Sequence, residues 1–415
     1  MTATAAALAP AAVKNFLQIH TLHSYPAGLL NRDDAGAAKR ITFGSAARIR
    51  ISSQSIKKKW RDASDAVGFS SIGENALRSR WTFEKRIVEP LLAKGVNMDV
   101  ARAIAQTLLD VVSGSSASAK AAKKKIPEVK SNQVLTIGQG EVRLLEAIAI
   151  EASRTTKPEE AVEQVLTLLT PERRKELQKR SSEVCGIDTA LFGRMTLGDV
   201  LLKYDAAVHV AHPFSVTAEN TEQDYFTAVD DLATEMDLAA SGHLGSSELT
   251  ANVFYGHVVV DLPLLVGNLT GASPAMWAAT DLTAAKHAMR SLITAIAMVS
   301  AGAKKGSTAP YTHADLVMIE LGAAQPCSHC NAFLDPVPPK GDVLAAAALR
   351  LARRAADMDK LYVSRNTPLL RRFCGSDKTD PITQGVDGRR AVLPSDARMT
   401  SLDDLLQWLD AEIGH

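Results

Sequence analysis

A block of helical periodicity interrupts an alternating strand–helix pattern, and this interruption is the feature that most constrains the fold. Residues 14–69 contain a strand candidate from Phe16 to His23, a polar loop, a short alternating strand and a helix. Residues 70–190 carry apolar residues at helical spacing, in segments bounded by prolines. Residues 191–325 return to strands, a long helix and a further strand. This order predicts an α+β fold, in which a split ferredoxin-like sheet receives a helical insertion.

The later elements are predicted from their own local signals. Apolar runs predict strands over residues 252–262 and 314–321. Helical periodicity predicts a long helix over residues 282–301 and an Ala-rich helix over residues 343–362. Ser401 begins a capping-box pattern, which should open the last helix.

The residues from Arg48 to Ser52 alternate strictly between polar and apolar types. In a strand, Ile49 and Ile51 would point inward, because side chains alternate between the two faces. The opposite face would then carry Arg48, Arg50 and Ser52. Guanidinium and hydroxyl groups on one face suit phosphate oxygens, which arginine can bind in a forked geometry.

A helix follows directly and adds an end that favours anions. Ser52 or Ser53 can cap this helix, because a serine hydroxyl accepts a hydrogen bond from a free N–H of the first turn. Its buried stripe is predicted at Ile56, Trp60, Ala63 and Val67. Off that stripe lie Lys57, Lys58 and Arg61. With the positive dipole end, these charges predict a surface that follows phosphates; a solvated basic face with a structural cap is the alternative.

The small net charge of the chain conceals a strong separation of charge. The sequence has 47 Lys and Arg against 46 Asp and Glu, a formal net charge of +1. From Tyr204 to Ala285, 82 residues contain eleven acidic residues and no Lys or Arg, so the rest carries +12. A nucleic-acid partner is therefore not excluded. Since aromatic residues make up only 5% of the chain, such a partner would be held by its backbone rather than by stacking.

Two carboxylates beside an arginine offer a different chemistry. Asp33 and Asp34 follow Arg32 and could hold a divalent cation for phosphodiester cleavage. The alternative is a loop in which the aspartates bond to the local backbone.

The cysteines and histidines form weaker patterns. Cys327 and Cys330 form a CxxC motif without a second pair, so we expect unligated thiols, although Cys374 could contribute to a zinc site. His209 and His212 are three residues apart and are expected to pack rather than to catalyse. No Walker loop or hydrolase motif is present, which argues against a metabolic enzyme.

Composition indicates the cellular setting. A chain with 46% hydrophobic and 22% charged residues is globular rather than disordered. Four cysteines are too few for a disulfide scaffold. No apolar run reaches the roughly 18 residues that a membrane span needs, and the Ala-rich first residues lack the basic start of a signal peptide. We therefore expect a cytoplasmic protein.

Several segments, taken in order, resemble one known family. They are LNRDD (residues 30–34), RIRISSQSIKKKWR (48–61), LFGRM (191–195), AAVHVAHPFSV (206–216), DYFTAVDDL (224–232), SGHLGSSELTANVFY (241–255) and DPITQGV (380–386). Over nearly its whole length the chain resembles the CasC family, the repeated backbone subunit of the type I-E CRISPR Cascade complex, in the repeat-associated mysterious protein superfamily.

This resemblance implies a hand-shaped protein with an RRM-like palm, helical fingers and a β-hairpin thumb. The implied ranges are the palm at 14–69, 191–204 and 251–325, the fingers at 70–190, the thumb at 205–250, and a helical extension packed on the palm at 326–415.

The resemblance also implies a non-catalytic function. Copies would assemble head to tail along a CRISPR RNA, grip its backbone and leave its bases free to pair with target DNA. Further implied partners are the large subunit, the small subunit, the guide-handle-binding subunit and the guide-processing endonuclease, with no cofactor, metal or membrane. The alternative is a guide-dependent RNA endonuclease using Asp33 or Asp34, as in related type III backbone subunits.

Site residues are carried over from the matching segments. The RNA contacts would be Arg32, Arg48, Arg50, Ser52, Ser53, Gln54, Ser55, Lys57, Lys58, Arg61, Arg194, Met195, Lys304 and Lys305. The thumb and its wedge would use His212, Tyr225, Phe226 and Leu244. Target DNA would be attracted by the fingers residues Lys120, Lys123, Lys124 and Lys125. The acidic thumb residues Asp230, Asp231 and Glu235 are expected to dock on the next copy.

Overall fold

The computed structural model describes nine stretches of the chain. They are residues 14–63, 67–115, 127–179, 181–196, 198–229, 241–302, 305–362, 369–385 and 391–414. The chain divides into two compact units. The sheet unit comprises Met1–Gly68, Val210–Val260 and Arg290–His415, and the helical unit comprises Phe69–His209 and Asp261–Met289. The helical unit thus includes residues 191–204 and 261–289, which the sequence analysis assigned to the palm, and residues 205–209, which it assigned to the thumb.

A seven-stranded sheet forms the centre of the sheet unit. Its strands are β1 (Phe16–Gly28), β6 (Val208–Val210), β7 (Phe214–Ser215), β8 (Thr221–Val229), β9 (Ser241–Asp261), β10 (Leu316–Gly322) and β11 (Leu370–Gly375). They follow the order β11–β10–β1–β9–β6, and β7 and β8 also pair with β9. The pairs β1/β10, β10/β11 and β8/β9 are antiparallel. The α+β class predicted from the sequence is confirmed.

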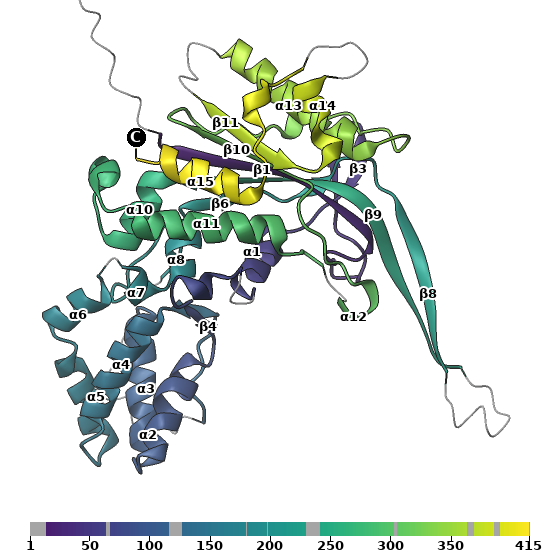
Figure 1. The fold of residues 1–415 in the computed structure, drawn as a ribbon. Coiled ribbons are helices and arrows are strands. Elements are labelled where there is room, and N and C mark those ends of the chain that lie inside the picture. Colours follow the sequence, from purple (N-terminus) through teal and green to yellow (C-terminus); the bar gives the residue numbers. More distant parts are fainter. Residues whose placement is uncertain are drawn as a thin grey trace, which may run out of the picture. The chain divides into compact units, whose positions relative to one another are not determined.

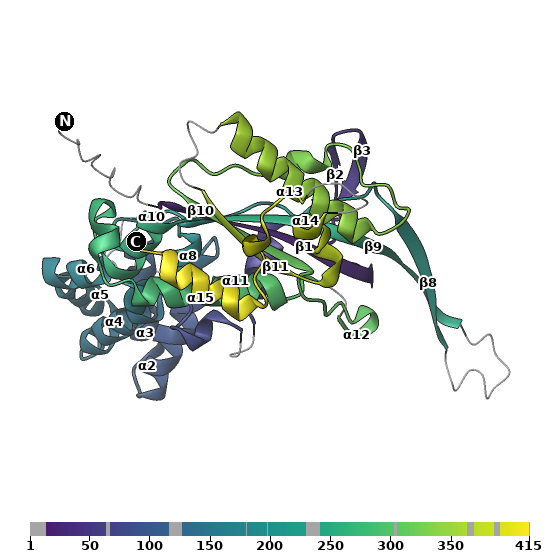
Figure 2. The ribbon, with the colours of Figure 1, turned by 45° about the horizontal axis from the view of Figure 1, so that its top comes forward.

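Helices cover both faces of the central strands (Figure 1). Leu22 of β1 and Tyr255 of β9 share a buried cluster with Leu351 of α13 (Val343–Leu361). Their neighbours Thr21 and Phe254 face the opposite side, because side chains alternate along a strand. That side packs on α1 (Ser53–Arg61) and the end of α11 (Thr283–Met298). Figure 2 shows α13 and α14 (Pro381–Gln384) over the first face.

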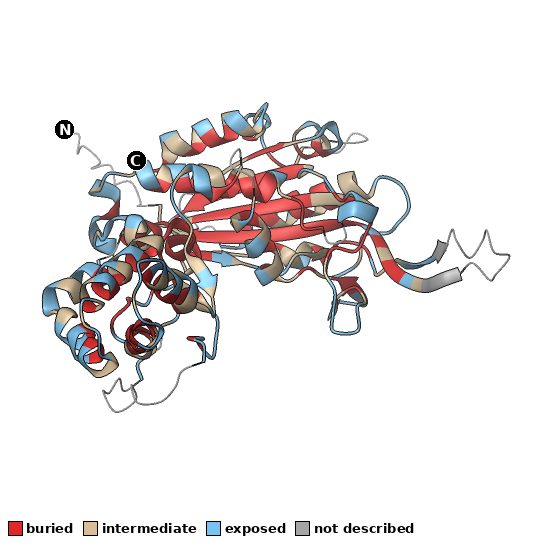
Figure 3. Ribbon diagram, turned by 90° about the horizontal axis from the view of Figure 1, so that it is seen from below, coloured by how far each residue is buried: buried red, intermediate tan, exposed pale blue. Residues whose placement is uncertain are grey.

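Short elements complete the sheet unit. They are β2 (Arg40–Phe43), β3 (Ala46–Ile49), α12 (Lys305–Thr308), η5 (Cys330–Phe333), η6 (Asp377–Thr379), η7 (Ser395–Ala397) and α15 (Leu402–Glu412). The predicted cap of the last helix is confirmed, because the Ser401 hydroxyl accepts a hydrogen bond from the Asp404 N–H. Figure 3 shows the central strands largely buried, and β10 is buried along its whole length.

The helical unit packs amphipathic helices around its own core. Its elements are η1 (Phe69–Ser71), β4 (Leu77–Ser79), the π-helical turn η2 (Glu84–Val88), α2 (Glu89–Ala93), α3 (Met98–Val112), β5 (Leu135–Ile137), α4 (Gln139–Ala152), α5 (Pro158–Leu168), α6 (Pro171–Leu177), α7 (Ser182–Cys185), α8 (Ile187–Phe192), α10 (Leu262–Thr270) and η4 (Pro274–Ala279). Its core includes Ile104, Leu108, Leu145 and Val165. Apolar residues at helical spacing therefore meet at the centre of this unit, as the periodicity predicted.

Strand β9 is 21 residues long and continues beyond the central strands as one arm of a hairpin (Figure 1). Its first residues pair with β8, from Thr221 opposite Thr250 to Val229 opposite Ser241. Among the described residues, no helix is both long and apolar enough to cross a membrane.

Candidate nucleic-acid interface

The segment predicted to bind phosphate folds as β3 followed by α1. Ile49 and Ile51 are each 2% exposed, and α1 buries Ile56 and Trp60, so their predicted inward positions are confirmed. Helix α1 ends at Arg61, before the last two predicted stripe positions.

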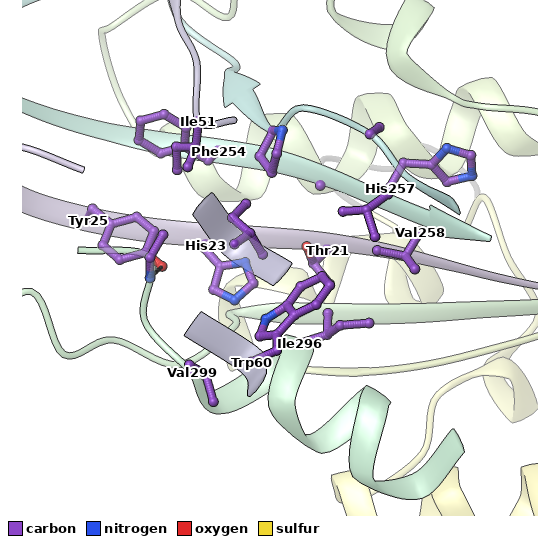
Figure 4. A pocket seen from close by; sticks show the side chains of 16 residues that line it. Thr21, His23, Tyr25, Ile51, Trp60, Phe254, His257, Val258, Ile296 and Val299 are labelled. Carbon is purple, nitrogen blue, oxygen red and sulfur yellow. Dashed lines mark hydrogen bonds between the residues drawn. The ribbon is translucent and has the colours of Figure 1, made fainter. Parts of the chain in front are cut away.

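A small apolar cavity of about 40 Å³ lies between α1 and the sheet. Figure 4 shows Trp60 and Ile51 approaching Thr21, His23 and Tyr25 there. Burial lowers the pKa of His23 to about 4, so this imidazole is neutral at pH 7. The apolar contacts hold α1 on the sheet and direct its polar side outward.

Arg48 is the clearest correction to the sequence analysis. It is 0% exposed, and its guanidinium donates to the carbonyl oxygens of Ser215 (3.0 Å), Val216 (2.7 Å), Thr217 (3.1 Å) and Phe333 (2.7 Å). A buried cation held by backbone carbonyls cannot reach a phosphate. Arg48 therefore has a structural role in this chain.

The N-terminus of α1 gathers the polar groups that stay accessible. Ser52 is the N-cap, and its hydroxyl accepts from the Ser55 N–H at 3.2 Å. His212, which is exposed, accepts at Nδ1 from the Ser53 N–H at 3.2 Å and lies 3.3 Å from Nη1 of the half-buried Arg50. Because Nδ1 accepts, the proton of the neutral ring is on Nε2. Arg50, His212 and exposed Gln54 therefore offer donors beside the positive helix end.

The remaining predicted contacts on α1 lie toward its C-terminus. Lys58 is exposed and pairs with Asp62, while Lys57 and Arg61 are half-buried. Basic residues in the last turn complement the negative end of the helix dipole. Ser53 is buried and Ser55 half-buried.

Asp33, one of the two aspartates, stabilises its own loop by hydrogen bonds to the backbone. Asp33 Oδ1 accepts from the Ala35 N–H at 3.0 Å and the Ala37 N–H at 2.9 Å. Arg32 and Asp34 are exposed in the same loop. Asp33 thus has the backbone-bonding role that the sequence analysis weighed against a metal site.

The two hairpin aromatics point to opposite faces of β8, because they are adjacent in a strand. Tyr225 is 72% exposed and Phe226 43% exposed. Phe226 lies over Gly245, where an added Cβ would come within 2.4 Å of its ring. With Lys305 and Asp224, Phe226 lines an open groove of about 580 Å³. The groove combines an aromatic face with a cation.

Arg194 is the second correction. It lies in the helical unit, is 5% exposed, and makes a two-pronged ion pair with Glu141, with distances of 2.5 and 2.8 Å. Its Nη2 also donates to the Leu202 carbonyl at 2.7 Å. Arg194 therefore holds the helical unit together, whereas Met195 beside it is 89% exposed.

Several predicted residues lie outside the described parts of the chain. They are Lys120, Lys123, Lys124, Lys125, Lys304, Asp230, Asp231, Glu235 and the side chain of Leu244.

The predictions for the cysteines and for His209 concern residues that the structure describes. All four cysteines are free thiols. Exposed His209 lies with Nε2 3.1 Å from the Ala206 carbonyl oxygen.

Arg40 is a residue that the sequence analysis missed. It pairs with Glu219 and Glu248, so two members of the acidic segment are neutralised within the chain. Burial raises the pKa of Glu248, but the Ala38 N–H and Arg40 outweigh it and hold the pKa below its usual range. Since its partners lie 179 and 208 positions away, no local pattern could have identified Arg40.

The fold has counterparts among known proteins. A family model of CT1975-like proteins matches residues 17–408. The chain belongs to the CT1975-like protein family. This membership confirms the CRISPR-associated family identified from the sequence. No curated protein matches the CT1975-like chain.

Two solved structures are similar to the CT1975-like chain. A chain of a "CRISPR RNA-guided surveillance complex, pre-nicking" is 27% identical, with a TM-score of 0.74, over 96% of this chain and 100% of that one. A chain of a second "CRISPR RNA-guided surveillance complex" is 24% identical, with a TM-score of 0.65, over 95% and 99%. The second likeness concerns the fold alone.

Proposed function

We propose that this CT1975-like protein is a non-catalytic, CRISPR RNA-binding backbone subunit of a type I-E surveillance complex. The observation that carries the proposal is the polar N-terminus of α1, where Arg50, Gln54 and His212 present donors to an anion. The likeness to a chain of a CRISPR RNA-guided surveillance complex supports the setting.

The strand order supports an RRM-like palm. The elements β1, α1, β6, β9, α11 and β10 follow one another along the chain, and the four strands lie in the order β10–β1–β9–β6. This is the order of a ferredoxin-like sheet, with the fourth strand beside the first. The helical unit would then serve as the fingers and the β8/β9 hairpin as the thumb.

The palm would hold the guide by its backbone. Arg50 and the N-terminus of α1 would bind phosphates, with Arg32 and Lys58 adding charge at longer range. The groove beside Phe226 and Lys305 would receive a base that the hairpin displaces. The remaining bases would stay free to pair with target DNA, so the guide would supply the sequence specificity.

Assembly would place copies head to tail along the RNA, beside the large, small, guide-handle-binding and guide-processing subunits. The acidic segment would face the basic surface of the next copy. Arg40 already neutralises Glu219 and Glu248, so Asp230, Asp231 and Glu235 are the residues to test. Reversing two of these charges should weaken filament formation, and unchanged assembly by mass measurement would reject this contact.

We further propose that the subunit does not cut RNA. The bonds from Ala35 and Ala37 to the Asp33 carboxylate support a structural role. Guide-loaded complex incubated with complementary RNA and Mg²⁺ should leave the RNA intact. Regularly spaced cuts that disappear in Asp33→Ala or Asp34→Ala would establish the endonuclease instead.

The central test is co-purification with the neighbouring operon products, followed by sequencing of the bound RNA. Small RNAs with a repeat-derived handle are expected. An Arg50→Met, Gln54→Ala variant should retain less RNA, whereas Tyr362→Phe, an exposed substitution at the C-cap of α13, should retain the wild-type amount. Purification of a complete complex without RNA would contradict the proposal.

A further inference from the structure

A buried cluster of imidazole and carboxylate groups lies on the α13 side of the sheet. His20 of β1 is 0% exposed, Glu320 of β10 is 1% exposed, and His329, just before η5, is 2% exposed. One ligand atom of each residue lies within 4.8 Å of the others. None of the three takes part in the proposed RNA interface.

The distances suit a tetrahedral metal ion. His20 Nε2 lies 3.4 Å from Glu320 Oε2, and His329 Nε2 lies 3.0 Å from Glu320 Oε1. In a tetrahedral zinc site with bonds of about 2.0–2.2 Å, neighbouring ligand atoms are about 3.4 Å apart. The two distances run to different oxygens of Glu320, and one ligand atom of each residue lies within 4.8 Å of the others, so side-chain shifts would bring all three to one ion.

The hydrogen bonds orient His20 as a ligand. Its Nδ1 lies 2.9 Å from the Tyr255 hydroxyl, which also accepts from the His329 backbone N–H at 3.2 Å. If Nδ1 carries the ring proton, Nε2 directs its lone pair toward Glu320. Among the described residues, His20 Nε2 has no hydrogen bond of normal geometry. An outer hydroxyl that fixes the ring in this way is typical of metal-bound histidine.

The charged groups around the cluster favour a cation. Arg371 binds Glu320 Oε1 through Nε (2.7 Å) and Nη2 (2.6 Å), and it also binds Asp359 (2.7 Å). Glu320, Asp359 and Arg371 carry a formal sum of −1, so the charged side chains named here give the cluster a net negative charge that favours a cation.

We propose that His20, Glu320 and His329 bind one divalent transition metal ion, for which zinc is the best match to imidazole and carboxylate ligands. The ion would join β1, β10 and the segment before η5, with its fourth position taken by solvent. The ligand group contains His329 from the Cys327-to-Cys330 motif but neither cysteine.

Cobalt(II) tests the site, because its visible absorption reports coordination number and ligand type. Full-length protein is stripped with chelator, titrated with Co²⁺ and then challenged with Zn²⁺. The expected result is one equivalent of Co²⁺ with a four-coordinate spectrum, no thiolate charge-transfer band, and full displacement by Zn²⁺. His20→Asn and Glu320→Gln should each weaken binding by more than about 10-fold, the lower bound for losing even an outer partner.

Matched variants separate this site from surface binding. His287→Asn removes an exposed histidine, and Cys327→Ser with Cys330→Ser removes both thiols of the motif; each should bind Co²⁺ as the wild type does. Binding that survives His20→Asn, or a thiolate band that disappears in the cysteine variant, would overturn the proposal. If His20→Asn does not fold, the wild-type stoichiometry and spectrum still decide, because absence of stoichiometric binding also overturns it.

Discussion

Arg48→Met and Arg50→Met, two substitutions only two residues apart, should have opposite consequences. Arg48 is fully buried, and its guanidinium donates to four backbone carbonyls. Arg50 is half-buried beside His212 at the start of α1. We expect the first substitution to damage the fold and the second to damage RNA binding.

The magnitudes follow from these contacts. Each buried carbonyl that loses its donor costs about 1–3 kcal/mol before relaxation. Since the desolvation cost of the guanidinium disappears as well, the net loss should be about 3–5 kcal/mol, the usual cost of breaking a buried charged network. For a unit of this size, that corresponds to a drop in melting temperature on the order of 10 °C.

For Arg50→Met, stability should change by no more than about 0.5 kcal/mol, as for most surface substitutions. Loss of one charged phosphate contact should cost about 1.5 kcal/mol, roughly 10-fold in affinity. It should also reduce the slope of log affinity against log salt concentration by about 0.7, the value per phosphate for a single strand.

Thermal denaturation of each variant, together with RNA titrations at several salt concentrations below its melting temperature, separates the two effects. The salt slope decides between the two effects, because partial unfolding lowers the fraction of active protein but leaves the slope of log affinity against log salt concentration unchanged. If Arg48→Met has the melting temperature of the wild type and its salt slope falls by about 0.7, then Arg48 contacts phosphate and the structural assignment is wrong.

Three further predictions follow from buried and exposed groups. Arg194→Leu should lower the free energy of unfolding of the helical unit by about 3–5 kcal/mol, because it leaves the buried Glu141 carboxylate without its ion-pair partner. The double variant with Glu141→Leu should have a higher melting temperature than Arg194→Leu alone, and equal melting temperatures would contradict this. If a base stacks on Phe226, then Phe226→Ala should weaken guide binding by about 1–3 kcal/mol. Tyr225→Ala, on the opposite face of the strand, should weaken binding less in a fluorescence titration. Equal losses for the two variants would contradict base binding in the groove. Burial lowers the pKa of His257 from 6.5 to about 3, so on acidification the unfolded chain binds a proton at this imidazole before the folded chain does. The free energy of unfolding should therefore fall by about 1.4 kcal/mol per pH unit as the pH drops from 6.5 toward 3. Urea unfolding of His257→Gln should lack this contribution, and an unaltered pH dependence would refute the assignment.

Features set by neighbouring residues could be predicted from the sequence. Ser52 and Ser401 cap their helices because each hydroxyl reaches an N–H only three residues ahead. Likewise, the apolar run after residue 314 forms β10, buried along its whole length. In each case a few positions contain all the information that determines the local structure.

Features set by distant residues could not be predicted in this way. Alternation placed Arg48 and Arg50 on one accessible face, but Phe333 from the C-terminal part of the chain covers Arg48. Arg194 similarly finds Glu141, 53 positions earlier. A basic residue in a phosphate-binding pattern has the same local sequence whether it faces solvent or backbone carbonyls, so only tertiary packing distinguishes the two.

The β8/β9 hairpin cannot hold an RNA backbone by charge. The segment from Thr221 to Asp261 contains no Lys or Arg, and the exposed carboxylates of Glu222 and Asp224 would repel phosphates. Any attraction must therefore come from the apolar face of Phe226 and from a cation outside the hairpin, which Lys305 supplies in the shared groove. A base carries no charge and presents a π-face, so it suits this groove better than a phosphate does. The palm would thus bind the charged strand, and the hairpin would act only on the bases.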